Sequence, residues 1–87
     1  MTEQEVGKIE VKKESIDRLL ILQREYYKTG NRELVPLISD NIWELARECA
    51  IGYVTLWDLT SAAVSCGLSN LKIYMILSLF DIEVVDN

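Results

Sequence analysis

Apolar residues recur at helical spacing along four segments of the chain, and glycines or small polar residues separate these segments. Helices are expected over residues 16–28, 36–51, 55–66 and 70–80. Ser15, Thr55 and Ser69 are placed to cap the first, third and fourth helices, because their hydroxyls can accept hydrogen bonds from free N–H groups. Gly30 and Gly52 are placed to end the first two. The pattern therefore predicts one all-α domain of four helices over residues 1–87.

Both ends of the chain show a different pattern. Residues 8–12 alternate apolar and charged side chains, which is typical of a short edge strand, and residues 82–85 provide a second extended segment. A strand needs a neighbour, so we expect a short two-stranded pairing of the termini. The alternative is that both segments are frayed tails.

The corner between the third and fourth helices has the most specific local signals. Thr55 and Asp58 form a capping box, and Val54 is placed to pack on Leu59 as a hydrophobic staple. Gly67 can adopt a positive φ and so permits a sharp turn. Two capped helices joined by one glycine are therefore expected over residues 55–80.

The spacing in this corner is Ala63-x3-Gly67-x5-Ile73-x2-Ile76. With these residues the chain resembles the helix-turn-helix superfamily, and residues 44–84 are similar to small prokaryotic antitoxin-type proteins of that superfamily. The resemblance implies a tri-helical helix-turn-helix core preceded by an extra N-terminal helix. It also implies that residues 70–80 are the recognition helix.

The charge distribution argues against DNA binding by that helix. The net charge is −5, and residues 1–34 contain seven basic and seven acidic side chains. From Val35 onward only Arg47 and Lys72 are basic, against seven acidic residues. The whole excess of negative charge thus lies in the half of the chain that contains the corner. Because neutralisation of phosphates supplies most of the affinity for nucleic acid, this argues against tight DNA binding by a single subunit.

The fourth helix has more apolar residues than one buried face can hold. Its expected core face is formed by Ile73, Ile76, Leu77 and Phe80. Leu71, Tyr74 and Met75 then lie on the opposite side. Either the first helix or a terminal strand covers them, or they form a patch for a partner, where tyrosine and methionine are enriched.

Of these alternatives we predict the patch. The expected partner-binding surface consists of Leu71, Tyr74, Met75, Ser78 and Trp43. Trp43 lies off the apolar line of its helix and is either a shoulder of the core or an exposed anchor. The leading hypothesis is a non-catalytic accessory subunit of the cytoplasm. It would bind a second copy of itself, or a larger nucleic-acid-processing complex such as a polymerase or transcription assembly.

The alternative hypothesis is a DNA-binding regulator or antitoxin. Its contacts to DNA would come from Ser69, Asn70, Lys72, Tyr74, Lys12, Lys13 and Arg18. This hypothesis requires the N-terminal basic residues to lie beside the corner.

An enzyme is not expected. The chain has no histidine, and therefore lacks the commonest general base and zinc ligand. Cys49 and Cys66 follow apolar helical patterns and are expected as reduced core residues. Asp40, Glu44 and Glu48 share a helix face, which we interpret as solvated rather than catalytic. No catalytic residue, metal or cofactor is predicted.

The polar N-terminus and the absence of an apolar run of membrane-spanning length predict no membrane segment.

Overall fold

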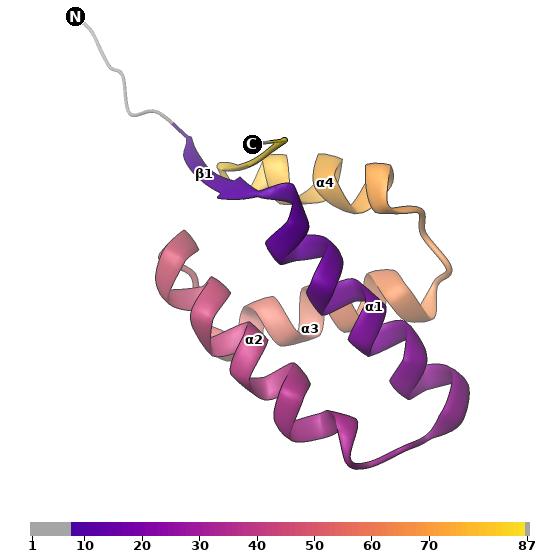
Figure 1. The fold of residues 1–87 in the computed structure, drawn as a ribbon. Coiled ribbons are helices and arrows are strands. Elements are labelled where there is room, and N and C mark those ends of the chain that lie inside the picture. Colours follow the sequence, from indigo (N-terminus) through magenta and orange to yellow (C-terminus); the bar gives the residue numbers. More distant parts are fainter. Residues whose placement is uncertain (1–7, 87) are drawn as a thin grey trace, which may run out of the picture.

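The structure is a computed structural model that describes residues 8–86, and it contains four helices and two short strands in these residues (Figure 1). In chain order the elements are β1 (Ile9–Lys12), α1 (Lys13–Thr29), α2 (Leu34–Cys49), α3 (Tyr53–Ser65), α4 (Asn70–Leu79) and β2 (Ile82–Val85). The predicted all-α, four-helix fold with paired termini is confirmed. None of the helices in the described part of the chain is both long and apolar enough to cross a membrane.

The main core lies between α1, α2 and α3. Leu19 and Leu20 of α1, Ile42 of α2 and Leu56 of α3 are fully buried in it. Their spacing along each helix gives one apolar stripe per helix, and burial of such stripes is the main source of helix stability in a small protein.

Strands β1 and β2 pair in parallel, with Ile9 beside Ile82. Parallel neighbours need a long crossover, and here the crossover is the whole four-helix body between the two ends of the chain. Val11 of β1 and Ile82 of β2 are buried in the core. Because β2 follows α4 after only two residues, the pairing ties the end of α4 to the start of α1 (Figure 1).

Two expected N-caps are wrong, and α2 begins at Leu34, two residues before the expected start. α1 begins at Lys13, directly after β1, so Ser15 lies inside the helix and not at its cap. α3 begins at Tyr53, with Gly52 as its N-cap, so Thr55 lies in the first turn. The Tyr53 ring lies 4.4 Å from that of Trp43, and this tertiary contact overrides the capping signal. Val54 is exposed and forms no staple.

The end of α2 also differs from the prediction. The helix ends at Cys49, and its C-cap residue Ala50 takes the left-handed conformation with φ +54°. Gly52 is the N-cap of α3 instead. The glycine that ends α1 is as predicted, because Gly30 has φ +70°.

The Gly67 turn and the Ser69 cap between α3 and α4 are as the sequence predicts. Gly67 has φ +75°, and the N–H groups of Leu68 and Gly67 donate to the carbonyls of Ala63 and Val64. This is the Schellman arrangement, which satisfies the last carbonyls of a helix. Ser69 Oγ accepts a hydrogen bond from the Lys72 N–H at 3.3 Å and so caps α4.

The two cysteines lie in different environments. Cys49 is buried, and burial together with the charge of Glu48 raises the pKa of its thiol to about 11. Cys66 is exposed at the corner, so its expected core position is wrong. It is the last residue before the Gly67 turn, where the chain leaves the packed side of α3.

Candidate interaction surface on α4

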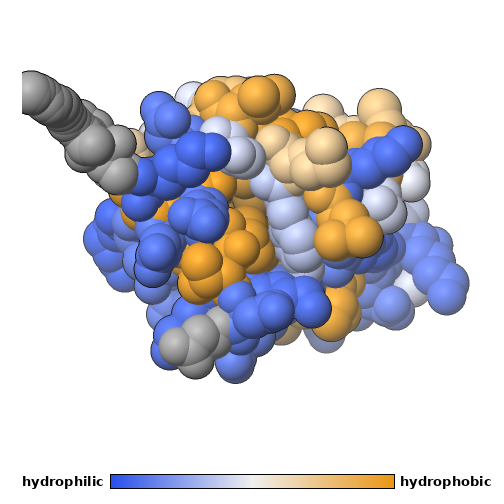
Figure 2. All heavy atoms as spheres, turned by 90° about the horizontal axis from the view of Figure 1, so that it is seen from above, coloured by the Kyte–Doolittle hydropathy of each residue, from blue (hydrophilic) through white to orange (hydrophobic). Residues whose placement is uncertain are grey.

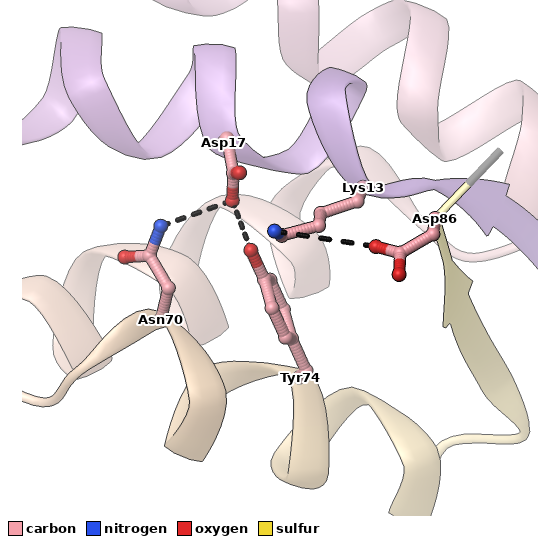
Figure 3. A network of polar contacts seen from close by, with 5 residues as sticks. All are labelled: Lys13, Asp17, Asn70, Tyr74 and Asp86. Carbon is pink, nitrogen blue, oxygen red and sulfur yellow. Dashed lines mark hydrogen bonds and ion pairs between the residues drawn. The ribbon is translucent and has the colours of Figure 1, made fainter.

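The inner face of α4 holds the helix against the body of the protein. Ile73 and Leu77 are fully buried. Beside them, the Tyr74 hydroxyl and the Asn70 side-chain amide both donate to Asp17 Oδ1 of α1, the amide at 3.0 Å (Figure 3). A carboxylate that accepts two hydrogen bonds from one helix fixes the rotation of that helix. One side of α4 is therefore committed to the fold.

The contact with Asp17 changes the acidity of Tyr74. Desolvation, followed by the hydrogen bond and the negative charge of Asp17, raises the pKa of the Tyr74 hydroxyl from its usual 10 to about 12. Between these values an unfolded tyrosine releases its proton while the folded one keeps it. The folded state is therefore favoured below pH 10 and loses this advantage as the pH rises toward 12.

A Tyr74→Phe variant should reveal this behaviour. At pH 7 it is expected to lower the free energy of unfolding by about 1–2 kcal/mol, because the hydrogen bond to a carboxylate is lost. The difference from wild type should narrow between pH 10 and pH 11, because only the wild type loses the contribution of this hydroxyl. Urea unfolding at pH 8 and pH 11 gives the free energies of unfolding of wild type and Tyr74→Phe. Tyr27→Phe, on the exposed side of α1, is the control. If the difference in unfolding free energy between wild type and Tyr74→Phe stays the same at pH 8 and pH 11, the contact of Tyr74 with Asp17 is contradicted.

The opposite side of α4 carries large apolar side chains in solvent. Leu71, Met75 and Leu79 are 71%, 68% and 82% exposed, and they follow one another at four-residue steps. Beside them is an open hollow of about 370 Å³, lined by Leu68, Lys72, Met75, Ile76 and Leu79. We call Leu71, Lys72, Met75, Ile76 and Leu79 the outer face of α4. Figure 2 looks onto the side of the molecule that carries α4, where apolar surface lies among charged groups.

The division between inner and outer face differs in part from the prediction. Ile76 is only half-buried and lines the hollow, and Phe80 is 46% exposed, so neither completes the core face. Ile73 and Leu77 are enough to bury α4, because it is short and β2 packs beside it. The outer face is therefore wider than the sequence indicated.

The predicted partner-binding residues do not form one surface. Leu71 and Met75 lie together on the outer face, whereas Tyr74 points to Asp17 on the other side. Ser78 is half-buried and accepts a hydrogen bond from Lys8 Nζ at 2.6 Å. The first helix and the N-terminal segment thus contact Tyr74 and Ser78, whereas Leu71 and Met75 stay exposed.

Trp43 belongs to a separate aromatic cluster. It is half exposed on α2, and its ring stacks on Tyr53, which in turn lies 5.9 Å from Trp57. α2 runs along the lower part of the molecule in Figure 1 and α4 along its upper edge. Of the two predicted placements for Trp43, the exposed one is found.

The residues of the DNA hypothesis are mostly engaged within the protein. Asn70 and Tyr74 bind Asp17, and Ser69 caps α4. Lys13 lies 4.0 Å from Asp86 and Arg18 lies 3.7 Å from Glu14. Lys12 and Lys72 are the exposed cations that remain of the set. Lys13 lies near α4 with Asp86 beside it (Figure 3), and Arg18 has Glu14 of its own helix beside it.

Two residues of this region were missed from the sequence. Leu79 is the most exposed large apolar residue described, and its four-residue spacing from Met75 was a usable signal. Asp17 has no such signal, because nothing in its own helix indicates that α4 contacts it. The carboxylates of Asp40, Glu44 and Glu48 are exposed on α2.

No protein-family model matches the chain, and no curated protein and no solved structure matches it either. Function is therefore inferred from the surface and its chemistry.

Proposed function

We propose that the protein is a non-catalytic interaction module that binds another protein through the outer face of α4. The observation that carries the proposal is the row Leu71, Met75 and Leu79, each more than two-thirds exposed, beside an apolar hollow. Contiguous apolar surface of this kind on a small protein marks an interaction site, because its removal from water is favourable.

The inner contacts of α4 support this proposal by making the outer face rigid. Ile73 and Leu77 in the core and Tyr74 on Asp17 hold α4 in one orientation. A preorganised surface loses little conformational entropy on binding. The partner is a second copy of the chain or a subunit of a larger assembly, of which a polymerase or transcription complex is the example that the helix-turn-helix resemblance suggests.

DNA binding is the weaker candidate. Direct contact would rely on Lys72 and Lys12, because Lys13 and Arg18 have acidic neighbours and the chain has a net charge of −5. Few free cations mean few released counterions and low affinity.

Charge on the outer face should abolish partner recovery. The tagged protein and its Met75→Glu variant are recovered from the native cells, and bound proteins, including untagged copies of the chain, are identified by mass spectrometry. Burying an unpaired carboxylate in an apolar contact costs several kcal/mol, so the variant should lose more than about tenfold of its bound partner.

Val54→Glu is the matched control, because Val54 is 67% exposed on α3 and lies beside the aromatic cluster. It is expected to recover the partner as wild type does. Loss with Val54→Glu and not with Met75→Glu would place the interaction on the aromatic cluster and reject the outer face of α4.

A further inference from the structure

Charged residues near the ends of α4 oppose its own dipole. Lys72 lies in the first turn, where the helix already has partial positive charge, and Asp81 follows the C-terminal end, where the partial charge is negative. Both side chains are exposed, and no ion pair among residues 8–86 involves either of them. Each charge therefore interacts more favourably with the dipole of a neighbouring antiparallel helix than with the dipole of α4 itself.

Asp81 is held firmly in this position. Its N–H donates to the Ser78 carbonyl at 3.1 Å, and its own carbonyl accepts from the Ile9 N–H at 2.9 Å. Its φ of +61° is a conformation that aspartate tolerates better than most residues. Asp81 thus stands at a fixed place beyond the last turn of α4.

We propose that the outer face of α4 binds the same face of a second copy, with the two helices antiparallel, so that Lys72 of each lies beside Asp81 of the other. This inference rests on the proposed function and names its partner. With the two-fold axis between Met75 and Ile76, Leu79 of one copy faces Lys72 of the other. Asp81 follows Leu79 by two residues, so it lies close to Lys72 of the other copy.

This arrangement gives a partner to the central apolar residues and to both charged residues. Met75 of one copy meets Ile76 of the other at the centre. Leu79 packs on the stem of the opposing Lys72, whose ammonium group reaches the edge. Each Lys72 also comes close to the negative end of the opposing helix, and each Asp81 to the positive end. A contact made twice by a two-fold axis is the common form of a small homodimer. A parallel arrangement would place Lys72 beside Lys72.

Charge reversal tests this pairing. Lys72→Glu alone sets two carboxylates against each other at both ends, and Asp81→Lys alone sets two cations against each other. Each variant should dimerise roughly tenfold or more weakly than wild type in sedimentation velocity at about 50 mM salt. An equimolar mixture of the two restores both attractive pairs, so it should regain near wild-type affinity. Lys28→Glu, on the exposed end of α1, is the control for net charge.

Cysteine cross-linking tests the direction without changing Asp81, whose replacement by lysine strains a left-handed position. In a Cys66→Ser background, Met75→Cys lies near the proposed axis and should form a disulfide between copies. Leu71→Cys should not, because the two positions are about 13 Å apart along antiparallel helices, beyond disulfide reach.

The outcomes separate this inference from the proposed function. Recovery by the mixture and cross-linking at position 75 alone support the antiparallel dimer. A mixture no tighter than its components, or equal cross-linking at positions 71 and 75, overturns it. A wild type that stays monomeric also overturns it. Recovery of a different protein that depends on Met75 would then leave the proposed function standing, and recovery independent of Met75 would reject both.

Discussion

Replacement of Leu77 by alanine should lower the free energy of unfolding by about 3 kcal/mol, whereas Leu79→Ala should change it by less than about 0.5 kcal/mol. The two leucines are two residues apart on α4, but Leu77 is 0% exposed and Leu79 is 82% exposed. Loss of the buried side chain removes its transfer free energy and leaves a cavity, while the exposed one has little to lose.

The pair is informative because it holds the residue type and the helix constant. Urea unfolding followed by circular dichroism gives both free energies. Equal destabilisation by Leu77→Ala and Leu79→Ala would mean that the outer face packs within the same chain. Leu79→Ala should instead weaken partner binding, so stability and binding separate on two faces of one helix.

The second large effect is expected at the junction between α4 and β2. Ile82→Ala should cost about 3 kcal/mol, because Ile82 is fully buried and its strand pairs with β1. Glu83 is the adjacent exposed residue, and Glu83→Ala should be nearly neutral. In a protein of 87 residues, whose total stability is only several kcal/mol, the loss at Ile82 should unfold a measurable fraction of the molecules.

Hydrogen exchange tests whether the terminal pairing is part of the same cooperative unit. The Ile9 N–H, bonded to the Asp81 carbonyl, should be protected in wild type and should exchange faster in Ile82→Ala. Rapid exchange of this amide in wild type would show that the termini open independently of the core.

Much of the fold could be predicted because local signals and burial agree. The stripes of α1 and α2 and the Gly67 turn each specify one local structure, and so does the Ser69 cap. The paired termini were predictable as extended segments. Their parallel direction was not, because it depends on where four helices bring the two ends of the chain.

The wrong start of α3 has a physical cause in tertiary packing. Thr55 and Asp58 form a good capping signal, but the stacking of Tyr53 between Trp43 and Trp57 begins α3 two residues earlier. Local capping contributes about 1 kcal/mol, and aromatic packing contributes at least as much.

The outer face of α4 was predictable only as a surplus of apolar residues. The sequence indicated that α4 has more of them than one face can bury, and the exposed Leu71 and Met75 agree with that count. It could not assign Tyr74, because the partner of its hydroxyl, Asp17, lies 57 residues away. It also could not show that Ile76 lines a hollow and not the core.

One face of α4 packs against the fold, and we propose that the other face binds a second copy of the chain. Sedimentation equilibrium of wild type and Leu79→Glu, at protein concentrations up to about 100 μM, is the decisive experiment. We predict twice the 10.0 kDa chain mass for wild type, and the single chain mass for Leu79→Glu with an unchanged unfolding free energy. A wild type of 10.0 kDa throughout, or a Leu79→Glu variant that remains at twice this mass, would contradict the claim.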